Sequence, residues 1–231
     1  MIKKIIAGLT LSVVLSSSLY ALQSVEVNTP CKYTAAVVPP KMSVQEKKQR
    51  FRDLIVPAVR KVYADLEAEY EESKKLIDSG NINTKIEALM KSYSAKDPQD
   101  LLKRMKPHAK SVAIAQAAME SAWATSRFTQ VALNLFGVWS FNKDEPRVAA
   151  GEKRGSKTIY VKKYSTIESS IRDYYKVLAT GRVFEEFRVV KMQSNDPYKL
   201  VKKLDKYSEK GAEYGKELSA MIKYNRFYKF D

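Results

Sequence analysis

The sequence predicts a mainly α fold with one small β-hairpin-like lobe. Apolar residues recur at helical spacing from Gln45 to Asp78, and a helix built from small and apolar residues surrounds Glu120. A charged segment at 142–158 holds two of the eight glycines and leads into a short strand-like run, Ile159-Tyr160-Val161. Helical patterns rich in tyrosine and phenylalanine follow. Because 231 residues can bury one sizeable core and no internal repeat is visible, we expect one main domain.

The first 21 residues have the pattern of a secretory signal. Lys3-Lys4 precede an apolar segment from Ile5 to Val14, and small residues follow up to Ala21. This apolar core is short for a membrane span, so we expect cleavage after Ala21 and no stable span in the mature chain. A retained amino-terminal anchor is the alternative. Residues 22–43 are polar and contain three prolines, which predicts a linker.

Three helices are expected in the N-terminal part of the domain, residues 44–107. The first follows the apolar spacing to Asp78 and ends at Ser79-Gly80-Asn81. Pro57 inside this run predicts a kink or a division into two helices. A further helix is expected from Asn83 to Ser92, and Asp97-Pro98 then opens a short helix at 101–105.

The next helix carries one unusual carboxyl group. At 100° per residue, Glu120 shares a face with Gln116 and with three alanines, Ala113, Ala117 and Ala124. A solvent-facing surface in a chain that is 29% charged should carry Lys and Glu there, so this face is predicted to be the floor of a cleft. Apolar surroundings raise the pKa of a carboxyl group, which can then act as a general acid near neutral pH. A solvated glutamate on an amphipathic helix is the alternative.

The composition excludes several kinds of site. Cys31 is the single cysteine, so no intramolecular disulfide can form, and His108 is the single histidine, so the usual zinc ligand sets cannot be assembled. A Ser-His-Asp or Cys-His system could use only His108, which we interpret as a residue of the turn before the Glu120 helix. We therefore expect neither a metal nor another cofactor.

Motifs along the second half of the chain resemble one enzyme family. Gln116-Ala117, Glu120-Ser121 and Asn134-Leu135-Phe136-Gly137 are followed by Tyr164-Ser165 with Ser170-Ile171 and Tyr174, and then by Leu204 to Ser208 with Gly211 and Tyr214. This order and spacing resemble the bacterial peptidoglycan N-acetylglucosaminidases of glycoside hydrolase family 73, most closely the bacterial Bax-type proteins. The resemblance covers about residues 44–231. It implies a lysozyme-like helical domain whose catalytic region is 108–231, with the β lobe over the active-site cleft.

The chain departs from the family at Ala122 and Ala124, where members usually carry glycine. Alanine favours helix over glycine, so the helix is expected to continue through both positions. If either position needs a positive φ or the close approach of a sugar, activity would be reduced.

The resemblance implies an exported hydrolase, periplasmic or associated with the cell wall, that acts on peptidoglycan glycan strands. The bond cut would join N-acetylglucosamine to N-acetylmuramic acid, with Glu120 as general acid. The alternatives are a muramidase or lytic transglycosylase, which cuts the other linkage, and a catalytically silent wall-binding protein, which the two alanines motivate. Cellular role, oligomeric state and protein partners are not predicted by any motif.

The net charge of the mature chain is consistent with a cell-wall hydrolase, but it does not identify the substrate. Residues 1–21 hold two lysines and no acidic residue, so 39 basic and 26 acidic residues leave a formal charge of +13. Such a charge suits the peptide carboxylates of a cell wall, while a general solubility charge is the alternative. A basic, tyrosine-rich nucleic-acid binder would need a cytoplasmic location, against which the signal argues.

The remaining site residues are expected from the resemblance and from sugar chemistry. A second carboxylate would come from Asp144, Glu145 or Glu152, with Glu145 first because it is nearest to the Asn134–Gly137 loop; ordinary surface charge is the alternative. The substrate's acetamido oxygen, with Tyr174 or Tyr207 near the developing cation, could fill the same role. Aromatic faces stack on sugars and amides bond to their polar groups. The predicted substrate-binding residues are Gln116, Asn134, Trp139, Tyr174 and Tyr207, whereas Phe136 is assigned to the core.

Overall fold

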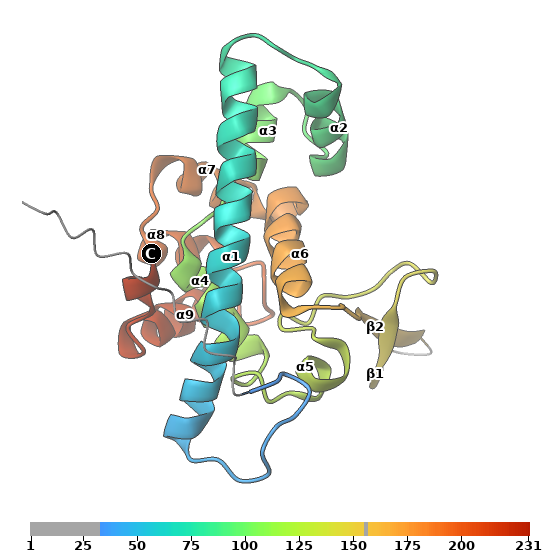
Figure 1. Cartoon of the computed structure of the whole chain (residues 1–231), viewed down its shortest axis with the longest axis vertical. Coiled ribbons are helices and arrows are strands. Elements are labelled where there is room, and N and C mark those ends of the chain that lie inside the picture. The colour runs from blue at the N-terminus through green and yellow to red at the C-terminus, as the bar shows by residue number, and fades with distance from the viewer. Residues whose placement is uncertain (1–32, 155–156) are drawn as a thin grey trace, which may run out of the picture. The chain divides into compact units, whose positions relative to one another are not determined.

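The computed structural model describes residues 33–154 and 157–231, whose elements are drawn in Figure 1. The helices are α1 (Val44–Asp78), α2 (Thr84–Tyr93), α3 (Pro98–Met105), α4 (Lys110–Glu120), α5 (Arg127–Ala132), α6 (Ile167–Thr180), α7 (Glu185–Gln193), α8 (Pro197–Leu200) and α9 (Ala212–Tyr224). Short 3-10 helices lie at η1 (Arg182–Phe184), η2 (Val201–Lys203) and η3 (Phe227–Phe230), and the strands are β1 (Arg147–Arg154) and β2 (Lys157–Lys162). The predicted class, mainly α with a small β-hairpin, is confirmed.

The first helix, α1, runs unbroken through Pro57 for 35 residues, so the predicted division into two helices is wrong. Its start is fixed by a capping box in which the Ser43 side chain and the Glu46 carboxylate each accept the other's backbone N–H. Pro57 removes one helical hydrogen-bond donor. The buried apolar face nevertheless continues across it, from Ile55 to Val59, and packing holds both halves in one helix (Figure 1).

Part of the predicted linker packs on the domain. The Arg50 side chain on α1 is fully buried and donates to the carbonyl oxygens of Thr34 at 2.6 Å and Val37 at 3.1 Å. Residues 34–37 are therefore bound to α1. The predicted signal peptide, 1–21, and the linker up to residue 32 lie outside the described residues. Within the described ranges, no helix combines the length and apolar character that a membrane span requires.

The two helices after α1 form close to their expected ranges, α2 one residue later and α3 starting three residues earlier, and each is capped by a side chain. The Asn83 side chain accepts the backbone N–H of Ile86 at the start of α2, and Asp97 accepts that of Asp100 at the start of α3. Pro98 occupies the first turn of α3, where its missing N–H costs no helical bond.

The β lobe is an antiparallel hairpin that also receives the loop after α5. Val148 pairs with Val161 and Ala149 with Tyr160. Trp139 forms an isolated bridge to Val161, so the 134–141 loop runs beside β2. The hairpin extends away from the helices in Figure 1, and this loop connects its base to the helical core.

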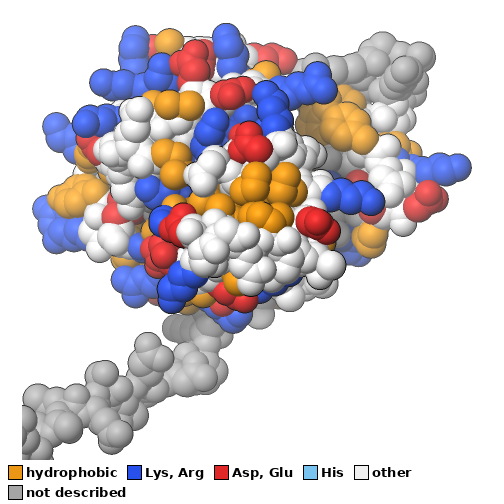
Figure 2. Space-filling model, turned by 90° about the horizontal axis from the view of Figure 1, so that it is seen from above, with side chains coloured by type: hydrophobic (Ala, Val, Ile, Leu, Met, Phe, Trp, Pro, Cys, Tyr) orange, Lys and Arg blue, Asp and Glu red, His pale blue; other side chains and the backbone are white. Residues whose placement is uncertain are grey.

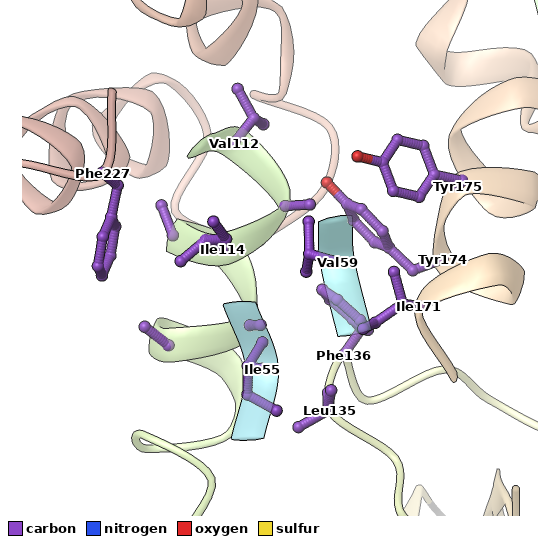
Figure 3. Packing of buried hydrophobic residues seen from close by; sticks show 14 of the residues in the cluster. Ile55, Val59, Val112, Ile114, Leu135, Phe136, Ile171, Tyr174, Tyr175 and Phe227 are labelled. Atoms are coloured by element: carbon purple, nitrogen blue, oxygen red, sulfur yellow. The ribbon is translucent and has the colours of Figure 1, made fainter. Parts of the chain in front are cut away.

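Helix α4 is buried on every side from Ser111 to Ala118. Figure 3 shows the surrounding side chains: Ile55 and Val59 come from α1, and Ile171 and Tyr174 from α6. The predicted cleft floor is therefore wrong, because Ala113, Gln116, Ala117 and Ala124 have no exposed surface. Small side chains on that face let neighbouring elements approach closely, so these alanines belong to the core.

Candidate active site

Helix α4 ends at Glu120, and a left-handed turn replaces the helix that was expected to continue. Ala122, Trp123 and Ala124 have φ values of 51°, 66° and 57°. The expected helical continuation through the two alanines is thus wrong. Both positions require positive φ, a conformation that costs an L-residue about 1–2 kcal/mol and glycine almost nothing.

Tertiary and local hydrogen bonds hold this turn. The Ser121 hydroxyl donates back to the Ala117 carbonyl and accepts the Ala124 N–H at 2.7 Å. From α1, Arg50 donates to the Ala124 carbonyl at 2.9 Å. The pairing of serine with glutamate in the motif thus has a physical reason, because Ser121 turns the chain sharply and leaves Glu120 at the helix end.

The Glu120 carboxyl group is open to solvent but closely surrounded by protein atoms. Its Oε1 accepts a hydrogen bond of 2.7 Å from the Tyr214 hydroxyl on α9. Partial burial raises the pKa of Glu120 above its ordinary value, while the bond from Tyr214 and the charge of Lys210 act in the opposite direction. Burial prevails, so Glu120 keeps its proton to higher pH than a solvated glutamate would.

The Tyr214 hydroxyl belongs to a chain of buried hydrogen bonds. It accepts from Gln116 Nε2 at 2.9 Å, and Gln116 Oε1 accepts from the Tyr174 hydroxyl at 2.6 Å. Since the Tyr174 proton is used in that bond, its oxygen accepts from His108 Nε2 at 3.0 Å. Burial and the nearby positive charge of Lys191 hold the pKa of His108 well below its usual value, so this ring is neutral. Every donor in the chain therefore points toward Glu120.

Three of the predicted substrate-binding residues lie below the surface. Gln116 and Tyr174 have no exposed surface, and both engage the hydrogen-bond chain that ends at Glu120. Asn134 is also buried; its side chain donates to the carbonyls of Val138 and Lys162 and accepts the Val138 N–H. Direct sugar contact, expected for all three, is not available in this arrangement. Gln116 and Tyr174 instead support Tyr214 and Glu120 through hydrogen bonds, and Asn134 holds the loop after α5 against β2.

Trp139 and Tyr207 do reach a surface cavity, of about 400 Å³. Its remaining lining comes from Phe136, Gly137, Val138, Phe141, Lys162, Val177 and Phe184. Tyr207 lies parallel to Tyr214, with ring centroids 5.6 Å apart, and so joins this cavity to the residue that holds Glu120. Phe136, assigned to the core from sequence, is buried and stacks on Tyr174 at 4.0 Å.

A second groove, of about 570 Å³, lies near the carboxyl end of α4. Met119 and Trp123, which flank the glutamate in sequence, line it together with Met221 and Tyr224 from α9. The Lys48 ammonium lies 4.9 Å from the Trp123 ring centroid. Apolar and aromatic surfaces are thus available next to the carboxyl group.

Glu145 lies at the base of the β lobe, just before β1. Its Oε1 accepts from the Ser140 hydroxyl at 2.7 Å, and its Oε2 is 3.9 Å from the Lys162 ammonium. Lys162 also lines the cavity of Trp139 and Tyr207, which places Glu145 beside that cavity. Asp144 is exposed, and the side chain of Glu152 lies outside the described part of the chain.

Residues beyond the predicted set also build the site. Ser121 and Tyr214 were visible in the sequence as parts of the family motifs, but nothing local gave them a role. No sequence pattern indicated a role for Arg50, because an arginine among the many charged residues of a long helix is common. Figure 2 shows Lys and Arg over the whole face seen from above, interleaved with Asp and Glu, which matches the spread of charge along the sequence.

Comparisons with known proteins agree with the motifs. Residues 95–227 match the glucosaminidase family described as mannosyl-glycoprotein endo-beta-N-acetylglucosaminidase. No curated protein matches the sequence. Among solved structures, an N-acetylmuramoyl-L-alanine amidase from Staphylococcus aureus is 17% identical, with a TM-score of 0.50 over 84% of this chain and 48% of the other.

Two further solved structures are similar. The catalytic domain of the autolysin Auto from Listeria monocytogenes is 18% identical over 84% of this chain and 100% of that domain, with a TM-score of 0.45. A truncated glycoside hydrolase domain of FlgJ from Salmonella typhimurium is 16% identical over 60% of this chain and 97% of that domain, with a TM-score of 0.40.

Proposed function

The chain belongs to the glucosaminidase family, and from that premise we propose that it hydrolyses the β-1,4 bond between N-acetylglucosamine and N-acetylmuramic acid in peptidoglycan, with Glu120 as general acid. The family match confirms the resemblance to the glucosaminidase family and the glycosidase class; the closer likeness to Bax-type proteins stays a prediction. The bond, the substrate and the residue roles are the proposal.

One observation carries the proposal most directly: the carboxyl group of Glu120, with its raised pKa, ends a buried helix and accepts a hydrogen bond from Tyr214. Glycoside hydrolysis needs a protonated acid at the leaving oxygen. Because Oε1 accepts from Tyr214, the proton of the acid form would reside on Oε2. The neutral hydrogen-bond chain behind Tyr214 keeps the orientation of the group constant.

Glycan binding would use both grooves. Trp139 and Tyr207 present aromatic surface in the first, where Tyr207 packs on Tyr214, the hydrogen-bond partner of Glu120. Trp123 and Tyr224 present aromatic surface in the second, which is also lined by Met119, the residue before Glu120. Sugar rings stack their apolar faces on such side chains.

The second catalytic role has two candidates. Glu145 could activate water or trap the cation, since it is half-buried beside the cavity lined by Lys162 and Tyr207. The substrate's own acetamido oxygen could do the same. Glu145→Gln separates them: a loss comparable to that of Glu120→Gln supports the carboxylate, and near-normal activity supports the acetamido group.

Peptidoglycan as substrate is supported by the motifs, by the basic mature chain and by the predicted signal, which would bring the protein to the periplasm or cell wall. The names of two solved structures point the same way, one being an autolysin and the other an N-acetylmuramoyl-L-alanine amidase. These names describe those proteins, and the substrate of this chain has to be measured.

A catalytically silent wall-binding protein is the second candidate, and the positive φ values of Ala122 and Ala124 favour it. Strain in the turn beside the acid could displace Glu120. Zymography in peptidoglycan gels tests the choice, with Glu120→Gln beside the wild type. Clearing by the wild type alone supports catalysis, whereas a wild type that binds the gel without clearing it supports the silent alternative.

A further inference from the structure

A cavity of about 410 Å³ lies between α1, α2, α3, α6 and α7 and includes none of the site residues named above. Five of its lining residues are cationic, and two are acidic. The cations are Arg104, Lys106, Arg172, Lys176 and Lys191, and the acids are Glu69 and Asp173. The cavity is therefore distinct from the grooves beside Glu120 and has an excess of positive charge.

Both acidic residues of the cavity already have partners. Glu69 accepts from Arg172 at 2.9 Å, and Asp173 accepts from Lys162 at 2.9 Å and from the Tyr164 hydroxyl at 2.7 Å. Arg104 is paired with Asp100, which lies outside the cavity lining, at 2.8 Å. Within the described ranges, the other three cations have no carboxylate at ion-pair distance: Lys106, Lys176 and Lys191.

Lys191 is the most unusual of these cations, since only 3% of its surface is exposed. Its ammonium donates to the Arg104 carbonyl at 3.1 Å, a bond that caps the end of α3. That bond uses one of three N–H donors, and no other hydrogen bond of this group is found among the described residues. Burial, followed by the positive charges of Arg188, Lys106 and Arg104, lowers the pKa of Lys191 to about 7. A buried cation among like charges is costly unless an anion joins it.

The rest of the lining defines what such an anion would carry. Leu66, Leu89 and Met105 supply apolar surface. The Lys176 ammonium donates to the Ser92 hydroxyl at 2.9 Å and lies over the Tyr93 ring, so it is held at the cavity wall. The volume of this cavity lies within the range of small-molecule sites, and its lining combines charged groups with some apolar surface.

We propose that this cavity binds a compact oxyanion, a carboxylate or a phosphate, carried by a ligand with a small apolar part. Lys191 and Lys176 would donate to the oxyanion, and the apolar walls would accept the remainder. Two independent observations support the site: a cavity whose lining has an excess of positive charge, and a buried ammonium with unused donors that lines it.

Proton uptake gives the proposal a specific signature. Bound anion favours the charged form of Lys191, so binding near pH 7 should take up protons, and affinity should fall as pH rises above 7. The titratable and charged groups around this ammonium are Arg104 and Lys106 near the end of α3, Arg188 on α7 and His108 before α4. The arginines do not change charge in that range, and the lowered pKa of His108 keeps its ring neutral there.

Isothermal titration calorimetry of the purified protein tests the site with three probes: acetyl-dialanine, its carboxamide and inorganic phosphate. Titrations in two buffers of different ionisation enthalpy measure proton uptake. The variants are Lys191→Met and, in case that variant does not fold, Lys176→Gln at a half-exposed position. Lys223→Met, at an exposed lysine on α9 outside the cavity, is the matched control.

We expect acetyl-dialanine or phosphate to bind and the carboxamide not to bind. Proton uptake is expected for acetyl-dialanine, whose carboxylate does not titrate near pH 7. Each cavity variant should weaken binding about tenfold or more, the usual effect of losing a charge-assisted hydrogen bond, and Lys223→Met should leave it unchanged. Binding of the dipeptide alone assigns a carboxylate ligand, and binding of phosphate alone assigns a phosphate ligand. The proposal is overturned if neither anion binds, if the carboxamide binds equally well, or if folded Lys176→Gln binds as the wild type does.

Discussion

The Tyr214 hydroxyl donates a 2.7 Å hydrogen bond to Glu120 Oε1, although the two residues are 94 positions apart in the sequence. This bond connects the last helix of the domain to the candidate acid at the end of α4. It also opposes the effect of burial on the carboxyl group, because a hydrogen bond to the charged form favours that form. Tyr214 thus both orients Glu120 and limits the rise of its pKa.

Tyr214→Phe should lower kcat by about ten- to a hundredfold, the effect of losing one hydrogen bond to a charged group. Removing the donor raises the pKa of Glu120 further, so the acid stays protonated over a wider range. The alkaline limb of the pH–rate profile should therefore move to higher pH. Tyr228→Phe, at an exposed tyrosine on η3 outside both grooves, is the matched control. An unchanged alkaline limb in Tyr214→Phe would show that the bond does not act on the acid.

Gln116→Leu should act on Glu120 through Tyr214. The substitution leaves the Tyr174 and Tyr214 hydroxyls without their buried partner, so the free energy of unfolding should fall by about 1–3 kcal/mol. Because Gln116 has no exposed surface, kcat should fall while KM stays near the wild-type value. Steady-state kinetics and urea unfolding measure both. A raised KM with normal kcat would instead support the direct contact between Gln116 and the sugar that was expected from the sequence.

Ala122→Gly should stabilise the fold, because position 122 has a φ of 51° and its side chain is exposed. Relief of the left-handed strain, about 1–2 kcal/mol, exceeds the entropy that glycine adds to the unfolded chain, about 0.4–1 kcal/mol. We expect a gain of about 0.5–1 kcal/mol by thermal unfolding. Ala220→Gly, at an exposed position inside α9, should lose about 1 kcal/mol. A loss in both variants would contradict the assigned turn.

Glu120→Gln should gain stability relative to the wild type as pH rises. The folded pKa of Glu120 is raised above its unfolded value, so the folded state of the wild type holds this proton more tightly. The resulting stability is present below the unfolded pKa and is lost as pH rises through the folded pKa. The neutral glutamine has no such loss. Thermal unfolding at pH 4 and pH 7 should show the larger advantage of the variant at pH 7, and an equal advantage at both values would contradict the raised pKa of Glu120.

Local signals predicted the elements well. The first three helices begin within three residues of their expected starts, at Val44, Thr84 and Pro98, and the charged segment before Ile159 forms the expected hairpin. These features depend on residues a few positions apart. The predicted division of the first helix at Pro57 was wrong, because the packing of a long apolar face outweighs the loss of one helical hydrogen bond.

The site was harder to predict, because contacts between distant residues build it. A face of small residues can line a cleft or allow close helix packing, and the helical pattern around Ala117 does not distinguish the two. The helix propensity of Ala122 favoured continuation, yet Ser121 and the buried Arg50 impose a left-handed turn. The motif singles out Glu120, whose catalytic role stays a prediction, whereas the interpretation of its alanine neighbours as a cleft floor was wrong.

Product analysis by mass spectrometry tests the central claim most directly. Purified peptidoglycan is treated with the protein lacking residues 1–21 or with its Glu120→Gln variant, and borohydride reduction marks new reducing ends. The account predicts fragments ending in reducible N-acetylglucosamine from the wild type and none from the variant. Fragments ending in reducible or anhydro muramic acid would contradict the proposed linkage, and the absence of any product would contradict catalysis.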